Sequence, residues 1–167
     1  TCALPIWDDV YVKSIEQVSD DFHARFDAKS RSYVYTFIRE PRPLEINHAE
    51  VLAGYCEITA MKAAAEVFLG EHDFAAFSKK NEDNFTTLCT VSWSEILEFE
   101  DRIEYHITAN RFLRNMVRRI AGTLMDAGSG KISPEVINQK LKSAEADAAG
   151  SKTAPAKGLK LVGVDYD

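Results

Sequence analysis

The sequence predicts a single α+β domain whose sheet is mainly antiparallel and whose helices pack on one face of that sheet. Three observations lead to this prediction. The length of 167 residues suits one domain. About five segments are rich in β-branched and aromatic residues, and about three carry helix formers or amphipathic periodicity, in mixed order and without an internal repeat. Hydrophobic residues make up 46% and charged residues 28%, a globular balance that excludes wholesale disorder.

The predicted strands are short runs of β-branched and aromatic residues bounded by turn signals. They are Val10–Val18, Ser30–Arg39, Thr86–Glu100, Arg102–Ala109 and Gly158–Val164. Pro41 and Pro43 end the second strand. The third and fourth form a hairpin, because only the charged pair Glu100-Asp101 separates them.

The predicted helices carry start and stop residues of known chemistry. Thr59 is the expected N-cap of a helix over Ala60–Leu69, and Gly70 the residue after its end. Ser133 and Pro134 begin a helix that runs to about Lys142. The longest helix is expected over Asn110–Ala127. The intervening stretches Glu71–Asn84 and Ala144–Lys157 are expected to be surface loops.

The Asn110–Ala127 helix separates apolar from basic residues when it is plotted at 100° per residue. Arg111, Arg114 and Arg118 fall on the side opposite the apolar stripe. A solvated helix face is one interpretation, and an anionic partner is the other. Arg31 stands beside Tyr33 and Tyr35, and basic residues interleaved with aromatic residues favour nucleic acid. The net charge of −6 and pI of about 5.3 count against it, so both interpretations stay open at this point.

Several classes of function lack their signature in this sequence. Cys2, Cys56 and Cys89 are far apart and form no C-x-x-C pair, and the four histidines have no metal-ligand spacing. No phosphate-binding or dinucleotide-binding glycine loop is present. We therefore expect no metal site and no disulfide framework. The cysteine usage favours a reducing cytoplasm. The sequence also has no apolar run long enough to span a bilayer and no basic-then-apolar signal peptide at its N-terminus.

Four strings occur in a fixed order along the chain: FHARFDAKSRSYVY at 22–35, GEHDFAAF at 70–77, ANRFLRNMVRRIAGTLMDAGSGK at 109–131 and APAKGLKLVGVDY at 154–166. Together they resemble the TruA family of tRNA pseudouridine synthases, and the resemblance covers nearly the whole chain. It implies isomerisation of uridine to pseudouridine at positions 38–40 of the tRNA anticodon arm, without a cofactor or metal. It also implies a homodimer.

The resemblance assigns roles to individual residues. Tyr33 matches the tyrosine that packs on the target base, Arg118 the arginine that pairs with the catalytic carboxylate, and Leu159 the leucine that walls the uracil pocket. Leu161 is then expected to be the core residue of the two leucines. The resemblance also implies RNA backbone contacts from Arg25, Lys29, Arg31, Arg111 and Arg114.

Two departures from the family pattern stand out. Cys89 occupies a position where the family usually has arginine, which puts one RNA or structural contact in doubt. The chain also has no Thr-Asp dipeptide, although the family nucleophile lies in a G-R-T-D-A-G-V-H string. We therefore expect residues 1–167 to be the C-terminal half of such a synthase, without the N-terminal domain that carries the aspartate. The alternatives are a standalone RNA-binding module and a degenerate interaction domain, neither of them catalytic.

Overall fold

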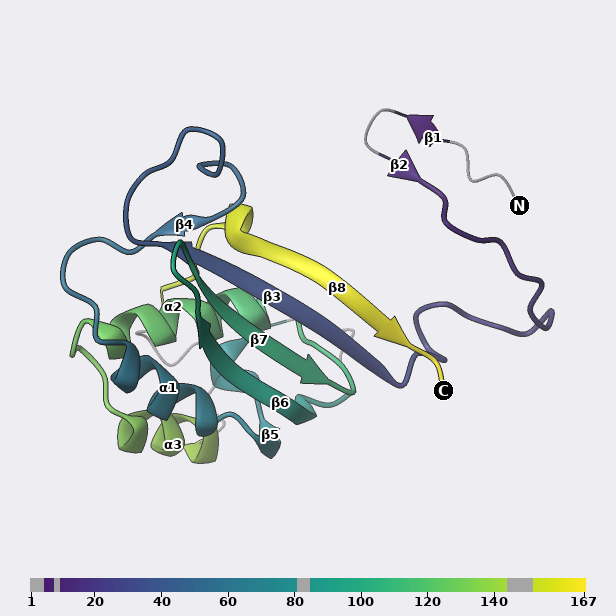
Figure 1. Ribbon diagram of the computed structural model, residues 1–167. Helices are drawn as coiled ribbons and strands as arrows, with labels where there is room; N and C mark the ends of the chain where they lie inside the picture. The colour runs from purple at the N-terminus through teal and green to yellow at the C-terminus, as the bar shows by residue number, and fades with distance from the viewer. Residues whose placement is uncertain (1–4, 8–9, 81–84, 144–151) are drawn as a thin grey trace.

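A computed structural model describes residues 5–7, 10–80, 85–143 and 152–167. A six-stranded sheet forms the centre, and three helices lie together on one side of it (Figure 1). The strands are β1 (Pro5–Trp7), β2 (Val10–Tyr11), β3 (Ser30–Ile38), β4 (Glu50–Val51), β5 (Gly70–Asp73), β6 (Leu88–Glu98), β7 (Ile103–Ala109) and β8 (Leu159–Asp165). The helices are α1 (Ile58–Glu66), α2 (Met116–Gly128) and α3 (Pro134–Ser143), with 3-10 turns at Ala75–Phe77 and Ala156–Gly158.

β3 is the strand around which the sheet is organised. The strand order is β4-β3-β7-β6-β5, and β8 also pairs with β3. β7 runs antiparallel along one edge of β3. On the other edge β8 pairs antiparallel with residues 30–35, and β4 pairs in parallel with Phe37 and Ile38. All other pairings are antiparallel, so the predicted fold class and the β6–β7 hairpin are confirmed.

The core lies between this sheet and the helices. Residues of β7 alternate strictly, and Ile103, Tyr105, Ile107 and Ala109 are all buried. They belong to one cluster with the apolar stripe of α2 and with Met61 of α1. The opposite sheet face is mixed: Val34 and Ile38 of β3 are buried there, and the hydroxyl groups of Ser32 and Thr108 meet in a 2.8 Å hydrogen bond. One face is thus committed to packing, which fixes the register of each strand.

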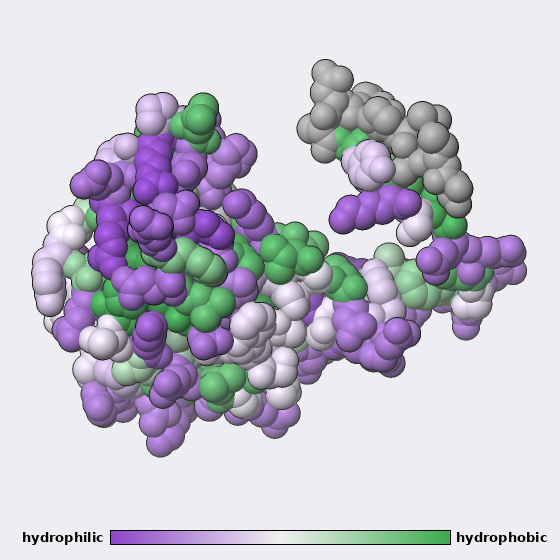
Figure 2. Space-filling view, viewed as in Figure 1, coloured by the Kyte–Doolittle hydropathy of each residue, from purple (hydrophilic) through white to green (hydrophobic). Residues whose placement is uncertain are grey.

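The predicted strand Val10–Val18 is wrong beyond Tyr11. Residues 12–29 form no strand, and most of them are exposed (Figure 1). An extended segment becomes a strand only when it pairs, and no described residue pairs with 12–18. This N-terminal segment contacts the rest of the protein near the segment's C-terminal end. There the ring centroids of Phe22 and Tyr166 lie 5.2 Å apart, and the Tyr166 hydroxyl donates to the Ala24 carbonyl at 2.9 Å. The remainder stands clear of the body, with hydrophobic and hydrophilic residues side by side (Figure 2).

The predicted surface loop Glu71–Asn84 is also wrong over its first half. Residues 70–73 form β5, and a 3-10 turn follows in which Phe77 is fully buried. Phe74 and Phe77 pack against Phe68, which anchors the segment to the core. The charged residues around these phenylalanines gave the segment a polar composition that concealed its buried side chains. Residues 81–84 lie outside the described part of the chain.

The helix ends differ slightly from those predicted. Glu57, and not Thr59, is the N-cap of α1, and the Thr59 hydroxyl donates to the Glu57 carboxylate at 2.6 Å. α1 ends at Glu66, so Gly70 is not its terminal residue; at φ 97° it begins β5. α3 agrees with the prediction to within one residue. Of the predicted loop Ala144–Lys157, residues 144–151 lie outside the described part of the chain, and residues 156 and 157 belong to the second 3-10 turn.

Candidate functional site

The sheet register places Tyr33 and Leu159 on the same face. Tyr33 pairs with Leu161 of β8, and Tyr35 pairs with Leu159, so all four side chains point to the helix side. Tyr33 is half-buried and packs edge-to-face on Phe112, with ring centroids 5.1 Å apart. Leu159 packs against the core, whereas Leu161 is 53% exposed. The expectation that Leu161 is the core residue of the two is therefore wrong, because β8 extends beyond the helices at that point.

Arg118 lies in the first turn of α2, and both its side chain and its backbone are hydrogen-bonded to residue 154. Its Nε donates to the Ala154 carbonyl at 2.7 Å, and the Ala154 N–H donates to the Arg118 carbonyl at 3.0 Å. No described carboxylate pairs with this guanidinium. As far as the described residues go, the two Nη groups are therefore available to an anion or carboxylate.

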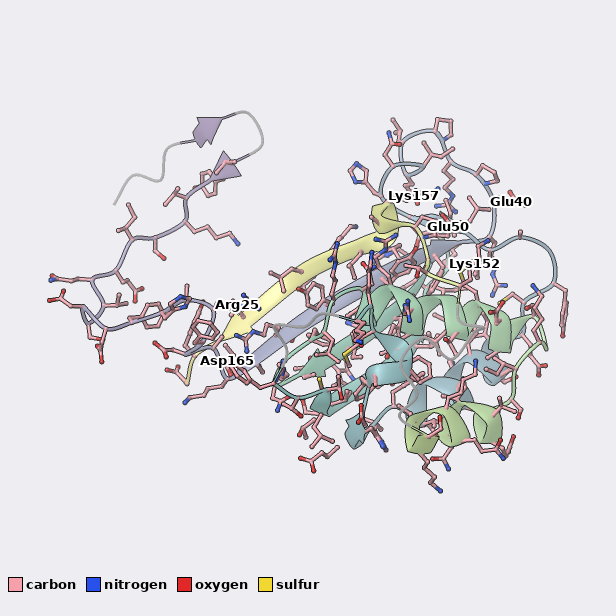
Figure 3. All side chains as sticks on the ribbon, turned by 180° about the vertical axis from the view of Figure 1, so that it is seen from behind. Arg25, Glu40, Glu50, Lys152, Lys157 and Asp165 are labelled. Atoms are coloured by element: carbon pink, nitrogen blue, oxygen red, sulfur yellow. The ribbon has the colours of Figure 1, made fainter. Side chains whose placement is uncertain are left out.

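Tyr35 contacts the segment that runs from the hydrogen-bond partner of Arg118 to Leu159. Its hydroxyl donates to the Pro155 carbonyl at 2.8 Å. Burial raises the pKa of this hydroxyl, the carboxylate of Glu50 raises it further, and the positive charge of Arg118 acts in the opposite direction. The hydroxyl consequently stays protonated at neutral pH and remains a donor. Lys157 of the same segment pairs with Glu50 at 3.1 Å, at the end of β8 remote from Arg25 and Asp165 (Figure 3).

The predicted arginine face of one long helix is wrong. α2 begins at Met116, so Arg111 and Arg114 lie in the segment before it. Asn115 has φ 62°, a left-handed conformation that interrupts any helix running through it. Asn110 instead extends the hairpin, because its N–H donates to the Thr90 carbonyl and its side chain accepts from the Thr90 N–H. The apolar periodicity was genuine for α2 and continued by coincidence into residues that do not form a helix.

The other predicted RNA contacts differ in how free their side chains are. Arg25 and Lys29 are exposed, and the Arg25 guanidinium lies 5.5 Å from the centre of the Phe26 ring. Arg31 donates to three backbone carbonyls, those of Arg25, Ala28 and Asn110. Its contacts fasten the end of the N-terminal segment to the start of β3. A role of these three residues toward RNA stays a prediction.

Cys89 cannot substitute for a surface arginine, because its side chain is 1% exposed in β6. Burial raises the pKa of its thiol to about 11, and nearby Arg111 acts in the opposite direction. The departure from the family pattern therefore falls in the packed interior, next to one of the predicted RNA contacts.

Two functional candidates were missed by sequence reasoning, Tyr35 and Gly122. A Cβ on Gly122 would collide with the Lys152 carbonyl, so a side chain there would displace the segment that holds Arg118. Its position inside a 13-residue helix was a usable sign, because glycine within a helix costs about 1 kcal/mol and needs a reason. Tyr35 gave no sign that distinguished it from a core tyrosine.

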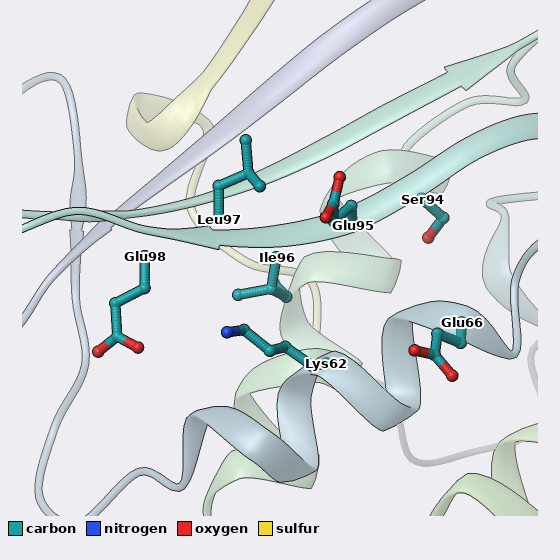
Figure 4. Close-up of a pocket in the computed structure, with 7 residues that line it drawn as sticks. All are labelled: Lys62, Glu66, Ser94, Glu95, Ile96, Leu97 and Glu98. Carbon is teal, nitrogen blue, oxygen red and sulfur yellow. The ribbon is translucent and has the colours of Figure 1, made fainter.

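A pocket in the described residues lies elsewhere. It has a volume of about 470 Å³ between α1 and the second half of β6, and it is lined by Lys62, Glu66 and residues 94–98 (Figure 4). None of the predicted site residues lines it. Within the described ranges there is also no cluster of three metal-ligating side chains and no helix that could cross a membrane.

Comparison with known proteins agrees with the motifs. A family model described as tRNA pseudouridine synthase matches residues 64–167, a stretch that contains both Arg118 and Leu159. tRNA pseudouridine synthase A of Bacillus subtilis is 40% identical over 165 residues, covering 96% of this chain and 65% of the relative. The enzymes of that name from Acetivibrio thermocellus and Listeria monocytogenes are 40% and 37% identical, and 66% and 65% of their lengths are covered. The chain thus spans about two thirds of the length of these curated relatives. It belongs to the tRNA pseudouridine synthase family.

Proposed function

We propose that this chain takes part in the isomerisation of uridine to pseudouridine in tRNA, at positions 38–40 of the anticodon arm. One observation carries the proposal: Arg118 is hydrogen-bonded to the segment that leads into Leu159, and Leu159 shares a sheet face with Tyr33. These are the three residues to which the family motifs assign the uracil site. A reactive base must leave the stack to be reached, and the half-buried Tyr33 side chain is partly accessible on this face.

The reaction breaks the N-glycosidic bond, turns the uracil and joins its C5 to the ribose. In this assignment Tyr33 packs on the base, Leu159 walls the pocket and Arg118 orients a carboxylate at the sugar. None of the twelve aspartates in the chain stands in a Thr-Asp dipeptide. The Nη groups of Arg118 are available for a carboxylate, which fits a partner contributed from outside these 167 residues.

The RNA contacts form the second part of the proposal. Arg25, Lys29, Arg31, Arg111 and Arg114 bind phosphates and position the tRNA without reading its sequence. The acidic net charge of −6 confines this binding to a local basic surface. The protein acts as a homodimer in the cytoplasm, where its tRNA substrate is found.

A chimera tests the catalytic proposal. This chain replaces the matching region of the Bacillus subtilis relative, which supplies the remaining third of the length. The chimera is incubated with unmodified tRNA and assayed for pseudouridine. We expect turnover in the chimera and none from the 167 residues alone.

Two results would contradict the proposal. Turnover by the 167 residues alone would place the nucleophile inside this chain. A folded chimera that binds tRNA with a strong salt dependence but produces no pseudouridine would favour a standalone RNA-binding module.

A further inference from the structure

The segment Lys152–Leu159 packs closely against two elements of the core, and at each contact one of the two residues is a glycine. At α2, a Cβ on Gly122 would overlap the Lys152 carbonyl oxygen and lie 2.8 Å from its carbon. At β3, a Cβ on Gly158 would lie 2.8 Å from two ring atoms of Tyr35 and 2.9 Å from the Thr36 carbonyl oxygen. Real Cβ atoms do not approach so closely, so both contacts depend on the missing side chain. The backbone of this segment therefore has little room to move.

Between these contacts, hydrogen bonds fix the segment to Arg118 on one side and to Tyr35 on the other. Ala154 exchanges two hydrogen bonds with Arg118, one of them with its guanidinium Nε. The next residue, Pro155, accepts from the Tyr35 hydroxyl at 2.8 Å. Ala154 is 1% exposed, so water does not compete for these groups. Tyr35, the adjacent residues Pro155 and Ala154, and Arg118 are therefore linked by one continuous series of contacts.

We propose that Tyr35 is a positioning residue for Arg118, acting through the 152–159 segment. This inference rests on the proposed function for its catalytic meaning. A planar guanidinium whose Nε is fixed presents its two Nη groups in one direction only. A carboxylate partner then meets a preoriented fork and does not have to select one rotamer from many.

The test removes only the hydroxyl. In Tyr35→Phe the ring remains against Gly158 and the donor to Pro155 is lost. Tyr105→Phe is the matched control, because Tyr105 is equally buried and its hydroxyl bonds Ser94 at 2.9 Å. The Arg118 Nε–H resonance and the Ala154 amide are followed by NMR in the 167-residue chain. We expect hydrogen exchange at both to accelerate about fivefold in Tyr35→Phe, the ratio that corresponds to one lost hydrogen bond, and to stay within about twofold in Tyr105→Phe.

The same variants in the chimera separate catalysis from folding. We expect Tyr35→Phe to lower kcat about tenfold while KM changes less than about twofold, because misplaced groups cost rate more than binding. Unchanged exchange at Arg118 in folded Tyr35→Phe would overturn the proposal. Faster exchange with an unchanged kcat would overturn it as well, because orientation would then not limit turnover. If the chimera with Tyr35 intact is inactive, the proposed function fails, and the exchange data alone decide whether Tyr35 orients Arg118.

Discussion

In the proposed function, the guanidinium of Arg118 serves both structure and catalysis. Its Nε is held by the Ala154 carbonyl, while the Nη groups have no described carboxylate partner. In the chimera we expect Arg118→Lys to lower turnover about a hundredfold, since losing a charge-assisted pair at a reacting centre costs about 3 kcal/mol. tRNA affinity should change little, because lysine keeps the charge and loses only the planar fork. Single-turnover rates and filter binding measure the two quantities.

Arg111→Ala and Arg114→Ala provide the comparison at the same scale. Each is expected to weaken tRNA binding and to reduce the salt slope by about one unit, with the single-turnover rate preserved. If Arg118→Lys preserved turnover while Arg111→Ala abolished it, the two roles would be reversed. If none of the three substitutions had an effect, these arginines would be only solvated surface.

Cys89 gives a second prediction for a single residue. Because burial raises the pKa of its thiol to about 11, the reactive thiolate is scarce at pH 8. We expect Cys89 to react with a disulfide reagent at least about a hundredfold more slowly in the native protein than in urea, as followed by peptide mass spectrometry. Of the two described cysteines, half-buried Cys56 should be labelled before Cys89 in the native protein. Fast native labelling of Cys89 would show that β5 separates readily from β6.

Among the elements, α2 has little room for a side chain at Gly122. Gly122→Ala would force the Lys152 backbone away from the helix, and we expect it to lower the free energy of unfolding by about 2–4 kcal/mol. Gly130→Ala is the control: Gly130 has φ 74° and open space around it, so only the left-handed backbone opposes a side chain, at about 1 kcal/mol. Urea denaturation of both variants gives the comparison. Equal losses would mean that the 152–159 segment yields easily.

The elements also show what the sequence could predict. β3, β7 and α3 were predicted to within one residue and β6 to within two at each end, because alternation and capping are local properties. The start of α2 was not, because apolar periodicity continued across Asn115, whose left-handed backbone depends on contacts such as the bond from Lys79 N–H to the Arg114 carbonyl. Tyr33, Arg118 and Leu159 were named from family motifs. Tyr35 was missed because the role proposed for it depends on a hydrogen bond across 120 positions.

The whole molecule divides into a packed body and an exposed N-terminal segment. Most of residues 12–27 are exposed, including Ile15 at 83% and Phe26 at 73%. We expect limited trypsin digestion to cut first after Lys13 and Arg25, and the remaining body to melt within about 2 °C of the intact chain. Mass spectrometry and circular dichroism follow the two effects. Early cleavage after Arg31, whose guanidinium bonds three carbonyls, would contradict this division.

The pairing of β3 with β8 has a consequence for the order in which the protein is made. Residues 30–35 leave the ribosome long before residues 159–165 exist, so that edge of β3 has no partner from β8 during most of synthesis. At ordinary translation rates the wait is on the order of ten seconds. An open edge for so long is a site where a nascent chain can associate with another. The β6–β7 hairpin and the three helices can assemble on β3 in that interval. The Tyr35–Pro155 hydrogen bond, which holds the 152–159 segment beside Arg118, can form only when translation has passed residue 155.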